Sequence, residues 1–190
     1  MLTYVAIAIV IVVYAVAFRV PLRRRKTIEK RAAPSWMGMI LTGASFAALF
    51  IGMPRRIAVF GSGWYFAPNI VAAIASVLTV AGAVFIVWAQ RTLGKQWSFS
   101  ARLVEGHQLV TRGPYGIVRN PIYASLALLL ISLGMTFATP LRVGVALVLY
   151  VTGALMRIRA EEDLMRAAFG EQWEAYRRRV PALIPLPWRG

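Results

Sequence analysis

The sequence predicts an all-α integral membrane protein with about five transmembrane helices, the last two forming a C-terminal helical hairpin. Of its 190 residues, 59% are hydrophobic and only 15% are charged. A soluble domain of this length could not bury so much apolar surface, so lipid must solvate a large part of it. The basic residues gather in alternate connections between the apolar runs, which is typical of a multi-pass protein.

Each apolar run approaches the length of about 20 residues that a hydrocarbon core of about 30 Å requires. The predicted spans are Leu2–Phe18, Ser35–Met53, Ala67–Ala89, Ile122–Phe137 and Leu141–Met156. The first span is not expected to be a signal peptide, because its basic cluster follows the apolar run instead of preceding it. All five spans fit one membrane domain over residues 1–190, since too few residues remain for a second fold.

The fifth span is short, with 14 residues between Arg142 and Arg157. It crosses the bilayer if these arginines extend their charged ends toward water. We expect the helix to continue beyond the span as far as Phe169, with Gly170 as its C-cap. An amphipathic helix is expected next, over Glu171–Arg179.

The distribution of basic residues predicts the orientation. With the N-terminus outside, 19 Lys and Arg residues lie in cytoplasmic connections and 3 lie outside. This bias places residues 90–121 and 157–190 in the cytoplasm. The net charge of +15 is then explained by topology and by attraction to anionic lipid heads, so a nucleic-acid partner is not expected.

Two polar patches flank the predicted hairpin, and a hairpin would return both to the same membrane face. The first patch contains Asn120, a potential N-cap, and Pro121, which suits the first turn of a helix. The second contains Arg157 and Glu161, which are four residues apart and therefore share a helix face. On spacing alone, Arg157 and Glu161 are better explained as a solvated helix segment, and Asn120 and Pro121 need no function beyond a helix entry.

Several kinds of chemistry are excluded by residue counts. The chain has no cysteine, which removes thiol nucleophiles and thiolate metal sites. It has one histidine, His107, so neither a multi-histidine metal centre nor a Ser-His triad is expected. No metal ligand is predicted, and His107 by itself is better explained as a loop residue than as a base.

The order of motifs between Arg91 and Pro185 resembles the isoprenylcysteine carboxyl methyltransferase family, in a superfamily that includes phospholipid N-methyltransferases. The similar motifs are Leu93-Gly94-x-x-Trp97-Ser98, Glu105-Gly106-His107-x-Leu109-Val110-x-x-Gly113-Pro114-Tyr115, Val118-Arg119-Asn120-Pro121-x-Tyr123 and Arg157-x-x-x-Glu161-Glu162-x-Leu164-x-x-x-x-Phe169-Gly170-x-x-Trp173-x-x-Tyr176. One position departs from the pattern, because the family's usual histidine between arginine and proline is Asn120. Asparagine donates and accepts hydrogen bonds but is no base near neutral pH.

The resemblance implies an S-adenosylmethionine-dependent enzyme that releases S-adenosylhomocysteine and binds its cofactor in a cytosolic segment. It implies cofactor contacts at His107, Leu109, Val110, Gly113, Tyr115, Arg119, Asn120, Pro121, Tyr123, Glu161 and Glu162. Glu161 or Glu162 would hold the cofactor's amino group, and Arg157 would orient the methyl acceptor. Arg157 and Glu161 are therefore the predicted catalytic residues.

The expected function is methyl transfer to a lipophilic acceptor that enters from the bilayer. Carboxyl O-methylation of an isoprenylcysteine-like or prenylated substrate is expected first, because a carboxylate is already ionised and needs only orientation. A phospholipid N-methyltransferase of the phosphatidylethanolamine type is the alternative enzyme, in which Glu161 would deprotonate the amine. A non-catalytic membrane scaffold of the same fold is the third possibility.

Overall fold

The computed structural model describes residues 28–31, 36–52, 68–94, 102–104 and 108–185. Within these ranges the chain forms five α-helices, one 3-10 turn (η2) and one pair of short strands. The helices are α2 (Trp36–Ala48), α3 (Pro68–Leu93), α4 (Pro121–Phe137), α5 (Pro140–Phe169) and α6 (Glu171–Arg179). The predicted span Leu2–Phe18 lies outside the described residues.

The helix predictions from Ser35 onward are confirmed as helices, with small changes at their ends. α2 ends at Ala48 instead of Met53, while α3 runs past Ala89 to Leu93. α5 continues beyond its apolar part as far as Phe169, and Gly170 caps it at φ +50. Glycine suits this cap because positive φ costs it little.

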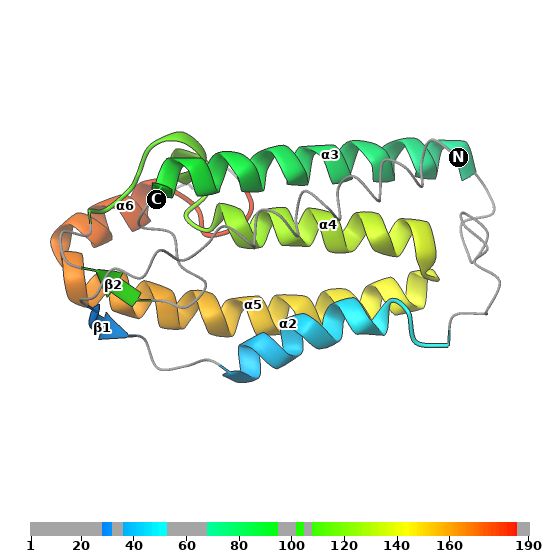
Figure 1. Cartoon of the computed structure of the whole chain (residues 1–190), viewed down its shortest axis with the longest axis horizontal. Helices are drawn as coiled ribbons and strands as arrows, with labels where there is room; N and C mark the ends of the chain where they lie inside the picture. Colours follow the sequence, from blue (N-terminus) through cyan, green and yellow to red (C-terminus); the bar gives the residue numbers. More distant parts are fainter. Residues whose placement is uncertain (1–27, 32–35, 53–67, 95–101, 105–107, 186–190) are drawn as a thin grey trace.

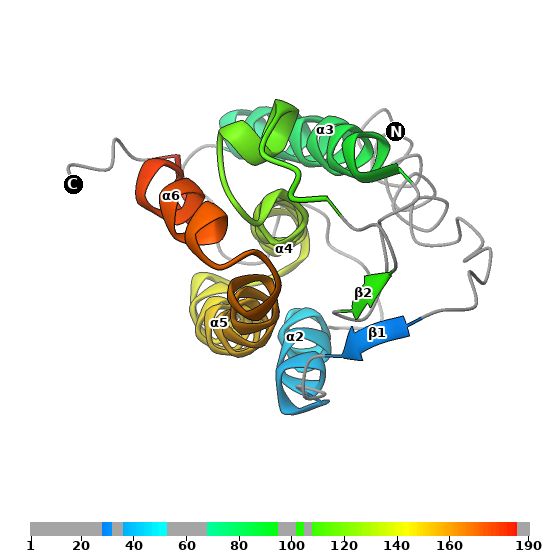
Figure 2. The ribbon, with the colours of Figure 1, turned by 90° about the vertical axis from the view of Figure 1, so that its left-hand side faces the viewer.

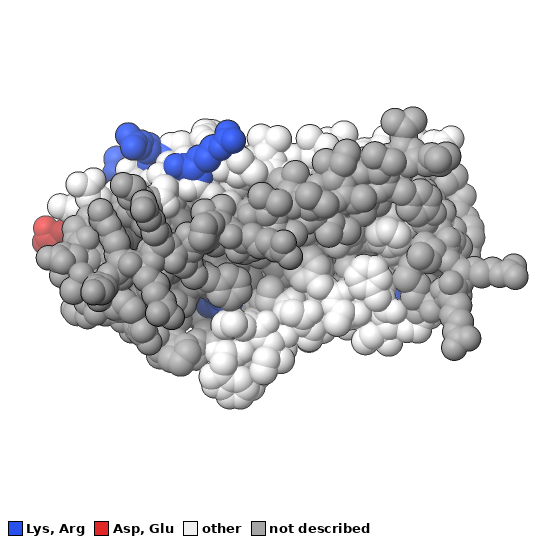
Figure 3. Space-filling model, in the orientation of Figure 1, with Lys and Arg blue, Asp and Glu red and all other residues white. Residues whose placement is uncertain are grey.

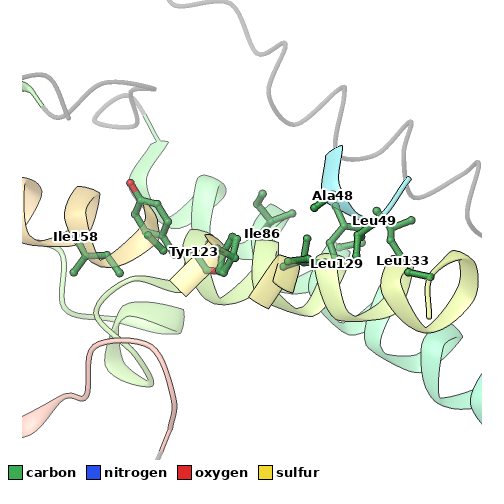
Figure 4. Close-up of a cluster of buried hydrophobic side chains, with 13 residues drawn as sticks. Ala48, Leu49, Ile86, Tyr123, Leu129, Leu133 and Ile158 are labelled. Carbon is green, nitrogen blue, oxygen red and sulfur yellow. The ribbon is translucent and has the colours of Figure 1, made fainter. Parts of the chain in front are cut away.

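The helices are arranged as two packed pairs. α3 lies along α4, and α2 lies along α5, while α4 and α5 form the hairpin that joins the pairs (Figure 1). Seen from the end that carries α6, α4 lies between α3 and α5 (Figure 2). The core extends along the bundle from Leu49 and Leu133 to Tyr123 and Ile158 (Figure 4).

Each pair is held by contacts that suit helices in lipid. A Cβ added at Gly153 of α5 would lie 2.8 Å from the Gly38 carbonyl oxygen and 2.9 Å from the Thr42 nitrogen, both in the backbone of α2. In the other pair, Thr79 of α3 and Ser132 of α4 hydrogen-bond to each other in the buried interface. Small residues and interhelical hydroxyl bonds are the usual means of helix association in membranes.

Two of the described helices are long and apolar enough to cross a membrane, namely α3 and α5. α3 keeps an exposed apolar stripe along one side, formed by Ile70, Ile74, Val77, Val80, Val84 and Trp88. In water such a stripe would be unfavourable, whereas lipid solvates it. On α5 the exposed apolar side chains end at Leu155 and Met156, immediately before Arg157.

A pair of short strands is present that was not expected from the sequence. β1 (Ile28–Arg31) pairs antiparallel with β2 (Arg102–Val104) at the same end of the molecule as α6 (Figure 1). β1 lies in the basic connector before α2, and β2 lies in the long connection before α4. The pairing gives hydrogen-bond partners to backbone groups that would otherwise need solvent.

Basic side chains gather at the end of the molecule where α3 finishes (Figure 3). Arg91 lies in the last turn of α3, where a cation interacts favourably with the helix dipole. This polar end is opposite to the α4–α5 connection, so the hairpin separates two chemically different ends (Figure 1). The start of α4 and the last part of α5, which contain the two predicted polar patches, lie at this polar end (Figure 1).

Candidate functional site

The two polar patches that flank the hairpin meet at the basic end of the bundle. The start of α4 lies against the part of α5 that follows its apolar segment, because Tyr123 hydrogen-bonds to Glu161 and Arg119 to Glu162. These partners are 38 and 43 residues apart in the chain. The prediction that the hairpin returns both patches to one end is confirmed.

Arg157, Tyr123 and Glu161 form one connected polar group. The Tyr123 hydroxyl donates to Glu161 Oε1 at 2.6 Å and accepts from Arg157 Nε at 2.8 Å. Arg157 Nη2 lies 3.7 Å from the same carboxylate oxygen, and the guanidinium carbon lies 5.8 Å from the centre of the Tyr123 ring. The hydroxyl thus fixes the cation and the carboxylate relative to each other.

The Tyr123 bridge is itself held in place by the hairpin. The Tyr150 hydroxyl of α5 donates to the Tyr123 carbonyl of α4, and Tyr150 is completely enclosed in the core. Tyr150 lies within the predicted fifth span, and the sequence pattern does not single it out. The available signal was its hydroxyl, because a buried tyrosine usually needs a hydrogen-bond partner.

Glu161 keeps one carboxylate oxygen for a ligand. Its Oε1 is taken by Tyr123 and Arg157, whereas its Oε2 has no polar partner within the described part of the chain. The side chain is 30% exposed, so a ligand can reach it. A carboxylate in this position suits an ammonium or hydroxyl donor.

Tyr115 offers a complementary donor. Burial raises the pKa of its hydroxyl, and the neighbouring Tyr176 and Glu161 raise this pKa further. The hydroxyl therefore stays protonated, and among the described residues it makes no hydrogen bond. The Tyr115 carbonyl accepts from the Tyr176 hydroxyl at 2.6 Å, which ties η2 (Gly113–Gly116) to α6.

Arg119 and Glu162 form an ion pair beside this group. Arg119 Nε and Nη2 lie 3.0 Å and 2.9 Å from Glu162 Oε1, and the two side chains are only 9% and 14% exposed. Arg119 Nη1 donates to the carbonyls of Arg177 and Val180. Arg119 therefore connects Glu162 of α5 with the C-terminal segment of the chain.

Asn120 occupies the N-cap position of α4, as predicted, but its side chain makes no capping hydrogen bond. The amide instead donates from Nδ2 to the Ala182 carbonyl at 3.2 Å. The capping prediction was wrong about this bond because Ala182, 62 residues away, competes for the same amide. Pro121 does begin the helix.

Of the remaining predicted cofactor residues, Leu109 and Val110 lie in the described segment before η2. Leu109 packs against a cluster formed by Trp173, Tyr176 and Val180, so the helix predicted over Glu171–Arg179 does have an apolar face. Val110 is half-buried. His107 lies outside the described residues.

Gly113 is required for the shape of the turn. Its φ is +61, and a Cβ there would lie 3.2 Å from Thr92 Oγ1 and 3.4 Å from Trp88 Nε1 of α3. Both the backbone angle and the close approach favour glycine. The turn therefore lies directly against α3.

We expect Gly113→Ala to destabilise the turn by about 1–3 kcal/mol, the usual cost of an unfavourable backbone conformation. Gly144→Ala is the control, because a Cβ at Gly144 meets no other atom within 4 Å. Hydrogen exchange of residues 113–118 in detergent would measure the effect. Equal exchange in both variants would contradict this account of Gly113.

Comparison with known proteins identifies the family. Residues 70–172, from α3 into α6, match the phospholipid methyltransferase family. The chain belongs to this family. Its members are methyltransferases, and the apolar helices agree with a membrane location, so the relationship expected from the order of motifs is confirmed.

Two proteins are similar to part of the chain. The chain is 31% identical over 85 residues to Protein-S-isoprenylcysteine O-methyltransferase B from Arabidopsis thaliana. The aligned region covers 45% of this chain and 43% of that protein. It is 37% identical over 100 residues to the cobalt-zinc-cadmium resistance protein CzcN from Cupriavidus metallidurans, covering 50% of this chain and 44% of that protein. The chain thus matches less than half the length of each relative.

The match to the phospholipid methyltransferase family includes all three members of the Arg157–Tyr123–Glu161 group. It also includes Tyr115, Arg119 and Glu162. It ends at residue 172, before the segment to which Arg119 and Asn120 are bonded. The matched range therefore contains the polar group, whereas the C-terminal partners of Arg119 and Asn120 lie beyond it.

Proposed function

We propose that the chain is an S-adenosylmethionine-dependent methyltransferase that methylates the carboxylate of a lipophilic, isoprenylcysteine-like acceptor. The observation that supports this most is the Arg157–Tyr123–Glu161 group. A cation and an accessible carboxylate are held together where the lipid-facing surface of α5 ends. An acid with its tail in the bilayer would bring its carboxylate to this depth.

The residues present fit the cofactor. Its amino group would be accepted by Glu161 Oε2, which has no partner among the described residues, and the Tyr115 hydroxyl is a donor for an anionic or polar group nearby. When bound, S-adenosylmethionine would supply an electrophilic methyl group on a sulfonium, with S-adenosylhomocysteine as the leaving group.

In this mechanism the protein mainly positions the acceptor. Arg157 would hold the carboxylate, whose oxygen is already ionised and therefore requires no base. The Tyr123 hydroxyl keeps Arg157 at a fixed distance from Glu161. The acceptor carboxylate on Arg157 and the cofactor's amino group on Glu161 would therefore be held in a fixed arrangement. Alignment of this kind accounts for a large part of the rate enhancement in bimolecular transfers.

Phospholipid N-methylation is the second candidate, and the family match favours it. An amine must lose a proton to become a nucleophile, and the free oxygen of Glu161 could accept that proton. The acceptor would then be an aminophospholipid whose headgroup reaches the same depth. The two proposals differ in the bond that is formed.

Transfer of a labelled methyl group separates these functions. The purified protein would be incubated with labelled S-adenosylmethionine and, separately, prenylcysteine, phosphatidylethanolamine or a free lipid acid. We expect label on the acid, released as volatile methanol by mild base. Base-stable label on phosphatidylethanolamine would support N-methylation instead, and failure to bind S-adenosylmethionine or S-adenosylhomocysteine would leave the scaffold as the explanation.

A further inference from the structure

The start of α4 is bonded to a segment that follows α6. The Arg119 amide donates to the Pro181 carbonyl at 2.8 Å, and the Asn120 amide donates to the Ala182 carbonyl at 3.0 Å. The side chains of both residues reinforce these bonds, with Arg119 reaching Val180 and Asn120 reaching Ala182. Residues 180–182 therefore lie along residues 119–120 like a short added strand.

The same segment is connected to the proposed cofactor site. Arg119 pairs with Glu162, which is next to Glu161, and Asn120 lies three residues before Tyr123. α6 also holds the carbonyl of Tyr115 through Tyr176. A shift of the segment would therefore move the residues that we place around the cofactor.

The side chains of Arg119 and Asn120 are committed to this task. Arg119 uses Nε and both terminal nitrogens on Glu162, Arg177 and Val180, and its side chain is 9% exposed. Four of the five N–H groups of the Arg119 guanidinium are thus used inside the protein. One N–H of the Asn120 side-chain amide donates to the Ala182 carbonyl.

We propose that Arg119 and Asn120 are positioning residues that hold the segment 180–182 against the start of α4 and thereby order the cofactor site. This inference deepens the proposed function. It assigns to the two residues a task different from the cofactor contact implied by the motif. Asparagine suffices at position 120 because the task needs a hydrogen-bond donor and no base.

A removable cross-link tests this assignment. The chain has no cysteine, so Asn120→Cys with Ala182→Cys introduces the only possible disulfide. The backbone bond between the two residues places them side by side, as a disulfide requires. The reduced and oxidised forms of this double variant have the same composition and control for each other.

We expect the reduced double variant to bind S-adenosylhomocysteine about ten-fold more weakly than the wild type, which is the usual effect of one lost hydrogen bond. Oxidation should restore the affinity to within about two-fold, because the disulfide replaces the positioning contact. If the disulfide forms and the affinity stays low, Asn120 contacts the ligand directly and the proposal is wrong. Failure to form the disulfide would also overturn it.

Hydrogen exchange provides a readout that is independent of the cofactor. The amides of Arg119 and Asn120 should be protected in the wild type, exchange faster in the reduced double variant and regain protection on oxidation. If the wild type binds no S-adenosyl ligand, the proposed function fails, while this exchange pattern still decides whether the segment is held. Unchanged exchange in all three forms would contradict the positioning role.

Discussion

Glu161→Ala and Arg157→Ala are each expected to lower kcat by about 100-fold, the loss that a small misplacement of reacting groups can cause. In the proposed function, removing Glu161 would take away the acceptor for the cofactor's amino group and would free Arg157 from its fixed position. Removing Arg157 would leave the methyl acceptor without its cation. Methyl transfer by the purified variants, measured at saturating cofactor, checks this result.

Arg159→Ala is the matched control. Arg159 lies two residues after Arg157 on the same helix, and its side chain is exposed. The control removes the same charge from the same end of the molecule, so activity should stay within about two-fold of the wild type, as the small effects of most exposed ion pairs suggest. Equal losses in Arg157→Ala and Arg159→Ala would show that only the total charge matters.

Tyr123→Phe tests the bridge within the same group. The ring stays in the core, and only the hydroxyl between Arg157 and Glu161 is lost. We expect an intermediate loss of activity, of about ten-fold, from one hydroxyl. In the Glu161→Ala background the same change should have little further effect, because residues that act as a unit are not additive.

Gly153→Ala should produce the largest loss of stability among the glycine substitutions. The new methyl group would lie 2.8–2.9 Å from backbone atoms of Gly38 and Thr42 and from Leu41 Cβ, so α2 and α5 would have to separate. Overpacking of this kind usually lowers the free energy of unfolding by about 1–3 kcal/mol. Denaturant unfolding in detergent measures the change.

Gly144→Ala is a control in the same helix. Its Cβ meets no atom within 4 Å, so the substitution only improves helix propensity, by up to about 1 kcal/mol. The two variants should therefore shift stability in opposite directions. A similar shift in both would mean that the close approach of α2 and α5 does not limit the packing.

Most helices of the fold could be predicted because their signals are local. Apolar runs, Pro121, Pro140 and Gly170 determine where α4 and α5 begin and end, and each is visible without knowing the neighbours. The strand pair could not be predicted in this way. β1 lies in a basic connector without apolar alternation, so only its partner β2 reveals it.

The candidate site likewise combines residues with a local sequence signal and residues whose contacts depend on distant parts of the chain. Arg157 and Glu161 could be paired from their spacing on one helix, and the structure places them together. Val180 is 61 residues from its partner Arg119, and Ala182 is 62 residues from its partner Asn120, so no local pattern connects them. The motif identified these residues, but their contacts depend on tertiary structure.

The bonds between residues 119–120 and 181–182 have a consequence for biosynthesis. A ribosome makes Arg119 and Asn120 about sixty residues before the carbonyl groups to which they are bonded. The nascent chain therefore reaches the bilayer with its helical hairpin already made, but before the hydrogen bonds between residues 119–120 and 181–182 can form. With the positioning role proposed for Arg119 and Asn120, full affinity for the cofactor would arise only after translation has passed residue 182, and partial translation products should bind the methyl donor weakly.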